Sequence, residues 1–210
     1  TAVPLGARPA YPPLMHADTT FILNGQPTDL AGAEPTQTLL RWLRSQHLTG
    51  TKEGCGDGDC GACTVVLVEA DQGGASHFVA VNSCLLPLGV LPGREVLTVE
   101  ALAEGDRLHP VQQALVEHHG SQCGYCTPGF VMSLFAGYHE GELDDRTTEG
   151  NLCRCTGYRP IRAATDALRE HRGDDARFAA LLERPRPAIT AARLGDFHSP
   201  VTLQDAIALK

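Results

Sequence analysis

Short hydrophobic runs in the first half of the chain predict a domain that combines strands with one helix. Residues 64–68 and 78–81 are rich in β-branched and aromatic side chains, and residues 95–99 form a third such run. Runs of this length bounded by glycine are typical of strands. Leucines at helical spacing within residues 38–47 predict a helix after an initial strand and hairpin. The pattern therefore predicts an α+β domain over residues 18–99.

From the middle of the chain onward, apolar residues recur with the period of a helix. One apolar stripe covers residues 111–116 and another covers residues 130–135. Thr127 and Pro128 predict a helix start before the second stripe, because a threonine hydroxyl can cap a helix and proline suits the first helical position. This part of the chain predicts a second, all-α domain over residues 100–172.

The regions outside these two domains are rich in proline or short. Residues 1–17 contain four prolines and predict an extended amino-terminal arm. Alternating arginine and proline within residues 173–196 predict a linker. Residues 197–210 return to an apolar helical pattern, and this stretch is too short to fold by itself.

Composition and charge narrow the classes of function. The chain has 210 residues, of which 42% are hydrophobic, so it can bury a core. Its net charge of -8, from 17 basic and 25 acidic residues, argues against non-specific binding to nucleic acid or to an anionic membrane. No apolar run approaches the ~18 residues of a membrane span. The start of the sequence lacks the pattern of a secretory signal, so we expect a cytoplasmic protein.

The first four of the eight cysteines have the spacing of an iron-sulfur site. Cys55, Cys60 and Cys63 form a C-x4-C-x2-C pattern that is followed at a distance by Cys84. This is the plant-type ferredoxin spacing, in which thiolates hold a 2Fe-2S cluster. Glycines between these cysteines allow a tight loop whose N–H groups can approach the cluster. The alternatives are a zinc knot or buried thiols, although zinc sites usually present paired C-x2-C arms.

The other four cysteines form two pairs, each next to a predicted helix start. They are Cys123 with Cys126 and Cys153 with Cys155. Helix amino termini favour thiolates, so the two pairs predict a second 2Fe-2S cluster. A Rieske centre would need two histidine ligands, whereas the cysteines already complete two four-thiolate sets. A thioredoxin-like redox pair at Cys123 and Cys126 would leave the other pair unexplained.

Three linked motifs resemble the iron-sulfur part of molybdenum hydroxylases. They cover residues 51–64, 120–129 and 150–160. Within this family, residues 107–112 are similar to xanthine dehydrogenase, and residues 197–210 resemble the opening of the FAD-binding domain that follows the iron-sulfur region in many bacterial small subunits. One departure is the stretch of residues 137–150, which is shorter than usual and lacks the short helix expected before the third motif.

The resemblance implies a fold, a route for electrons and a set of partners. The fold is an amino-terminal β-grasp ferredoxin domain followed by a four-helix bundle. Electrons would pass from a molybdenum-pterin centre on a partner subunit or domain through the second cluster, then the first, to FAD and NAD, as hypoxanthine or xanthine is oxidised to urate. Gln122 would hydrogen-bond the pterin, and the ligand Cys155 would lie near it. The chain would act within a hetero-oligomer.

Other functions stay open at this point. The chain could serve a molybdenum hydroxylase for aldehydes, carbon monoxide or N-heterocycles. From other classes, it could be a free two-cluster electron carrier or a zinc-stabilised interaction module. The sequence offers no nucleophile with a base, phosphate loop or dinucleotide fingerprint, so we expect no catalytic residue in this chain. His109, His118 and His119 lack metal-ligand spacing, and we expect structural or solvated roles for them.

Overall fold

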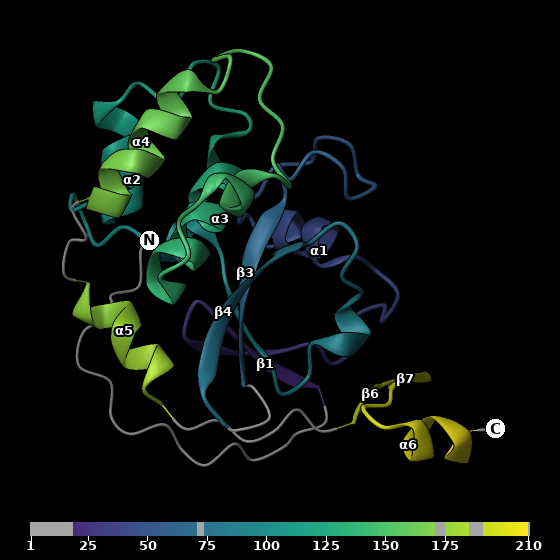
Figure 1. The fold of residues 1–210 in the computed structure, drawn as a ribbon. Helices are drawn as coiled ribbons and strands as arrows, with labels where there is room; N and C mark the ends of the chain where they lie inside the picture. Colours follow the sequence, from purple (N-terminus) through teal and green to yellow (C-terminus); the bar gives the residue numbers. More distant parts are fainter. Residues whose placement is uncertain (1–18, 71–73, 171–174, 185–190, 210) are drawn as a thin grey trace.

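Two domains pack side by side in the computed structural model (Figure 1). The structure describes residues 19–70, 74–170, 175–184 and 191–209, so the expected amino-terminal arm lies outside the described residues. Among the described residues, no helix is long and apolar enough to cross a membrane.

The first domain is a five-stranded sheet with one helix on it, as the pattern predicted. The sheet has the order β2-β1-β5-β3-β4, and its central pair β1 and β5 is parallel while the other pairs are antiparallel. The strands are β1 (Thr20–Leu23), β2 (Gln26–Asp29), β3 (Thr64–Ala70), β4 (Ser76–Asn82) and β5 (Glu95–Leu97). This topology, with helix α1 (Leu39–Ser45) after the first hairpin, is the β-grasp arrangement that the family resemblance implied.

Strand β3 is buried on both faces, which explains its continuous apolar run. Val65 and Leu67 pack in one hydrophobic cluster with Leu43 of α1. Val66 and Val68 point the other way and join the core of the second domain. Because side chains alternate along a strand, one strand serves both cores and joins the two domains.

The second domain is built around the apolar helix α3 (Thr127–Glu140). Helices α2 (Pro110–Glu117) and α4 (Arg159–Glu170) pack on each other and on α3, and α3 also contacts β3 and β4 (Figure 1). The predicted helix start is confirmed, but the predicted cap is wrong. Cys126 holds the N-cap position, and the Thr127 hydroxyl donates to Ser121 Oγ at 2.8 Å.

Part of the expected linker folds as a helix. Helix α5 (Ala176–Leu182) lies within residues 173–196, and its Phe178 side chain is fully buried. The Phe178 ring meets the Phe135 ring of α3 edge to face, with centroids 4.8 Å apart. The linker prediction is therefore wrong for this stretch, because an apolar helix face outweighs the prolines that follow. Residues 185–190, which carry the arginine-proline run, lie outside the described residues.

A second departure concerns the segment before the third cysteine motif. It contains the short 3-10 helix η3 (Asp145–Thr148), although the sequence led us to expect no helix there. Asp144 caps η3, and the Thr147 hydroxyl donates to the backbone oxygen of Glu142 at 2.8 Å. The Thr147 side chain also lies so close to Gly137 that a Cβ there would approach it to 2.6 Å. The short segment is thus fastened to the end of α3.

The carboxy-terminal segment forms a hairpin and a short helix. Strands β6 (Ala192–Leu194) and β7 (Phe197–Ser199) pair with each other and pack on the 3-10 helix η1 (Leu88–Val90) of the first domain. Residues 197–199 form strand β7 where a helical pattern was expected, and helix α6 (Leu203–Ala208) confirms that pattern from Leu203 onward. Its apolar residues stay exposed, and Figure 1 shows α6 projecting away from the helical domain.

Candidate iron-sulfur sites

The first cysteine set lies on the loop between α1 and β3 and on the turn after β4. Cys55 and Cys60 are on the outer part of the loop, whereas Cys63 and Cys84 are buried, with 2% and 6% exposure. The loop passes through the left-handed region at Gly56, Gly58 and Gly61, with φ of 79°, 92° and 65°. A side chain at these positions would strain the loop, so the glycines allow its tight path around the thiols.

The four thiols of this set approach each other in pairs. The backbone N–H of Cys55 donates to Cys60 Sγ and the N–H of Cys60 donates to Cys55 Sγ, both at 3.3 Å. Burial, followed by the neighbouring Cys63 thiol, raises the pKa of Cys84 to about 12. Cys84 therefore keeps its proton at neutral pH in the absence of metal, and it would have to release that proton to bind a metal ion.

The second set is placed by the amino-terminal ends of two helices. Cys126 precedes α3, and Cys153 and Cys155 lie on the loop before α4. Cys155 Sγ lies 3.5 Å from Cys123 Sγ. The backbone N–H of Tyr125 lowers the pKa of Cys123, while the Cys123 thiol raises that of Cys155. Burial and then Cys153 raise the pKa of Cys126 to about 12, so Cys126 and Cys153 form the second pair.

Paired thiols are the arrangement that a 2Fe-2S cluster needs. Each iron of such a cluster takes two cysteine thiolates, and thiolates bound tetrahedrally at about 2.3 Å from one ion lie about 3.8 Å apart. The 3.5 Å between Cys123 and Cys155 fits this spacing. The paired arrangement therefore suits two-iron clusters, in which each iron takes one pair of thiolates.

A close backbone contact joins the two cysteine sets. The Leu152 N–H donates to the carbonyl oxygen of Cys60 at 2.9 Å. Asn151 is 3% exposed, and its side-chain amide donates to the Gly61 carbonyl at 3.0 Å. A Cβ on Gly129 of α3 would lie 2.1 Å from the same Gly61 oxygen. The first cluster loop and the second cluster loop thus touch through their main chains, which only glycine allows at this point.

The residues expected near a pterin lie on an accessible face of the second set. Gln122, Cys123 and Cys155 are all exposed, and Tyr125 beside them is 50% exposed. The Tyr125 hydroxyl donates to the backbone oxygen of Glu53, so the ring spans from the second domain to the first. The pterin contact itself stays a prediction.

Three side chains around Cys153 were not singled out from the sequence. The Cys153 N–H donates to the Tyr158 hydroxyl at 2.9 Å, and Thr156 Oγ1 lies 3.1 Å from Cys153 Sγ. Asn151 makes the junction described above. All three residues belong to the motif of residues 150–160. The signal in the sequence was that polar side chains adjoin two closely spaced cysteines.

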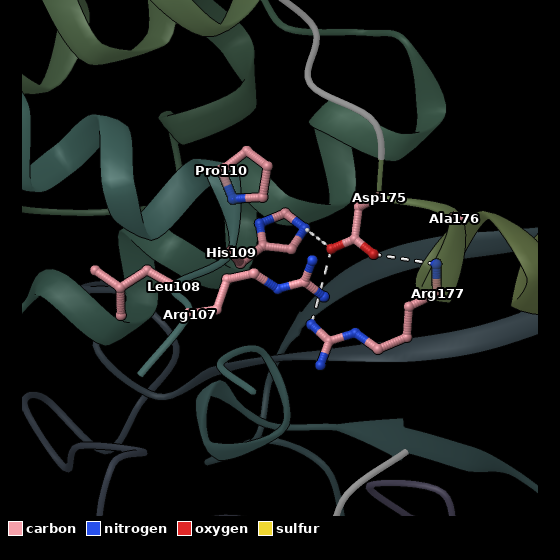
Figure 2. Close-up of a pocket in the computed structure, with 7 residues that line it drawn as sticks. All are labelled: Arg107, Leu108, His109, Pro110, Asp175, Ala176 and Arg177. Atoms are coloured by element: carbon pink, nitrogen blue, oxygen red, sulfur yellow. Dashed lines mark hydrogen bonds and ion pairs between the residues drawn. The ribbon is translucent and has the colours of Figure 1, made fainter. Parts of the chain in front are cut away.

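A pocket of about 320 Å³ lies away from the cysteine motifs in sequence, between Arg107–Pro110 and Asp175–Arg177 (Figure 2). Inside it His109 Nδ1 accepts from the Val111 N–H at 3.2 Å, and Nε2 faces His139 Nε2 at 3.2 Å and Asp175 Oδ2 at 3.3 Å. Burial, then the charges of His139 and Arg177, lower the pKa of His109 to about 3. A neutral, capping histidine has the structural role we expected.

Comparison with known proteins places all eight cysteines in cluster-binding domains. A family model described as a 2Fe-2S iron-sulfur cluster binding domain matches residues 21–88. A second model, described as a 2Fe-2S binding domain, matches residues 98–166. The first match falls on the β-grasp domain and the second on the helical domain.

Curated relatives and solved structures agree with these models. The chain is 44% identical over 173 residues to xanthine dehydrogenase 1 of Arabidopsis thaliana, which covers 78% of this chain and 12% of that protein. It is 45% identical over 152 residues to xanthine dehydrogenase/oxidase of Rattus norvegicus, covering 69% and 11%. The chain thus spans about a tenth of the length of the curated relatives it matches.

Among solved structures, quinoline 2-oxidoreductase from Pseudomonas putida 86 matches with 34% identity and a TM-score of 0.59, covering 72% of this chain and 95% of that chain. Aldehyde oxidoreductase from Desulfovibrio gigas matches with 34% identity and a TM-score of 0.60, covering 70% and 16%. With two cluster-binding domains in the same order and this level of identity, the chain belongs to the molybdenum hydroxylase family, in which it is an iron-sulfur component with two 2Fe-2S clusters.

Proposed function

We propose that the chain carries electrons between the molybdenum and flavin centres of a xanthine dehydrogenase. Two sets of four thiolates hold its 2Fe-2S clusters: Cys55, Cys60, Cys63 and Cys84 the first, and Cys123, Cys126, Cys153 and Cys155 the second. Electrons enter from the molybdenum-pterin centre of a partner subunit or domain, pass the second cluster and then the first, and leave to FAD and NAD.

The main-chain contact between the two cluster loops carries this proposal. The Leu152 N–H donates to the Cys60 carbonyl at 2.9 Å, and Leu152 is covalently joined to Cys153. One hydrogen bond and a few covalent bonds therefore connect a ligand of the first cluster with a ligand of the second. In the second set Cys123 and Cys155 are exposed whereas Cys153 is buried, which suits entry of electrons from a partner at the exposed cysteines.

The ligand assignment is tested by metal analysis and EPR. We expect iron and acid-labile sulfide equivalent to two 2Fe-2S clusters per chain, and two distinct signals after reduction by dithionite. Cys63→Ala and Cys126→Ala should each remove one signal, and the two variants should remove different ones. A colourless protein that contains zinc and gives no signal would overturn the assignment.

The route between the clusters is tested at Leu152. Leu152→Pro removes the N–H that donates to Cys60, whereas Leu152→Ala keeps the N–H and removes only a side chain that is 55% exposed. In the full-length protein, we expect freeze-quench EPR to show slower reduction of the first cluster in Leu152→Pro and a normal rate in Leu152→Ala. A proline variant that retains both clusters and the normal rate would contradict this route.

We infer a purine substrate from the relatives. Those named xanthine dehydrogenase are 44% and 45% identical to this chain, against 34% for quinoline and aldehyde oxidoreductases of known structure. Because the site of substrate oxidation belongs to the molybdenum partner, the test is turnover of xanthine against an aldehyde and quinoline by the assembled enzyme. Faster oxidation of an aldehyde or an N-heterocycle would favour the alternative hydroxylases.

The proposal includes the partners and the location of the chain. Gln122 hydrogen-bonds the pterin beside Cys155, and the molybdenum-binding and FAD-binding parts complete a hetero-oligomer. The eight cysteines are free thiols and form no disulfides, which suits the reducing cytoplasm. Fractionation of cells that express a tagged full-length protein tests the location. The flavin and molybdenum content of the purified protein tests the partners.

A further inference from the structure

The loop that carries Cys153 holds a hydroxyl directly on the ligand sulfur. Thr156 Oγ1 lies 3.1 Å from Cys153 Sγ, and the Thr156 N–H points to the same sulfur at 3.5 Å. Cys153 is 7% exposed, and Thr156 is partly buried beside it. Little water can therefore compete for this sulfur, which makes a protein donor more effective there.

The proton of this hydroxyl can be placed from its neighbours. The Tyr158 N–H donates to Thr156 Oγ1 at 3.1 Å and so occupies a lone pair of that oxygen. As a cluster ligand, Cys153 is a thiolate and has no proton to give. The remaining arrangement has the Thr156 O–H donating to Cys153 Sγ.

Tyr158 keeps the hydroxyl in this position. The backbone passes through the left-handed region at Gly157 and Tyr158, with φ of 65° and 67°, and the Tyr158 N–H lies against Thr156 Oγ1. Its own hydroxyl accepts from the Cys153 N–H at 2.9 Å, and its ring packs edge-on against Phe130, with centroids 6.3 Å apart. Both ends of Tyr158 are thus fastened to the loop and to α3, so the donor is held in place before the cluster takes up an electron.

We propose that Thr156 is a positioning residue that raises the reduction potential of the second cluster. On reduction the cluster accepts one electron and gains one negative charge, which is shared with its thiolate ligands. A hydrogen bond to a ligand sulfur therefore stabilises the reduced cluster more than the oxidised one. This inference rests on the proposed assignment of Cys153 to the second cluster.

The test is an EPR-monitored potentiometric titration of the full chain with both clusters. Thr156→Val removes the donor and keeps the size of the side chain, and Thr156→Ser restores the hydroxyl. Thr127→Val is the matched control, because Thr127 also adjoins a ligand, Cys126, but donates to Ser121 Oγ instead of a sulfur. The signal that disappears in Cys126→Ala identifies the second cluster.

We expect Thr156→Val to lower the midpoint potential of the second cluster. The ratio of reduced to oxidised cluster at a fixed potential should fall about tenfold, which corresponds to 59 mV for one electron. The serine variant and the Thr127 control should keep the normal midpoint, and the first cluster should not change in any variant. An unchanged midpoint in Thr156→Val, or a shift of equal size in the control, overturns the inference.

Two further observations keep the outcome decisive. If Thr156→Val does not assemble its clusters, Thr156→Ala replaces it with the same expectation. ENDOR should then reveal, in the wild-type protein, a proton that is coupled to the second cluster, exchanges in D2O and is missing in Thr156→Ala, which keeps the N–H of residue 156. Absence of that proton overturns the inference. A wild-type protein without the second EPR signal would instead defeat the ligand assignment, and the role of Thr156 with it.

Discussion

Acid should destabilise this protein through His109, a buried side chain far in sequence from every cysteine. His109 is fully buried as a side chain, and its pKa is lowered to about 3 by burial, with His139 and Arg177 adding to the effect. Its Nδ1 accepts the Val111 N–H at the start of α2, so protonation at that atom would remove the cap of the helix. The folded protein therefore holds His109 neutral.

The sign and size of the effect follow from linkage. The unfolded chain binds a proton at His109 below pH 6.5, whereas the folded protein does so only near pH 3. Stability is therefore fully present above pH 6.5 and falls as the pH drops toward the folded pKa. Between pH 7.5 and pH 5.5, this one group should cost about 1.4 kcal/mol of unfolding free energy.

The assay compares the wild-type protein with His109→Asn in urea at these two pH values, followed by far-UV circular dichroism. Asparagine is a good N-cap but does not titrate, so the variant has a lower baseline stability and a weaker pH dependence. Comparison of the two slopes cancels the contributions of titrating groups that do not contact His109 and of the clusters. Equal slopes would refute the reasoning. A wild-type protein that gains stability in acid would indicate a protonated His109 paired with Asp175, whose carboxylate lies 3.3 Å away.

Two further predictions concern packing. Gly129→Ala would place a Cβ 2.1 Å from the Gly61 carbonyl oxygen, and we expect it to lower the free energy of unfolding in urea by about 1–3 kcal/mol. Gly150→Ala is the control and should be neutral, because no atom lies within 4 Å of its added Cβ; equal losses in the two variants would argue against the contact between the cluster loops. Phe178→Ala should cost about 3–5 kcal/mol and lower the melting temperature, because its ring is fully buried against Phe135; an unchanged melting temperature would mean that α5 is a linker after all.

The cysteine spacing and the strand and helix periods could be interpreted without coordinates because they depend on near neighbours. A C-x4-C-x2-C loop brings three thiols together within a few residues, and an unbroken apolar run predicts strand β3. The start of α3 at Thr127 was visible in the same way. The N-cap of α3 was not predicted correctly, because the Thr127 hydroxyl donates to Ser121 Oγ and does not cap the helix.

Only the tertiary structure decided which distant residues meet. Helix α5 belongs to the fold because Phe178 fits against Phe135, a contact between positions far apart that the prolines downstream conceal. The Leu152 N–H reaches the Cys60 carbonyl because Gly61 and Gly129 let two main chains approach. Residue order by itself determines the cysteine spacing and the local elements of this protein. The distance between its two cluster loops depends on which faces pack together, because burial acts between surfaces and not along the chain.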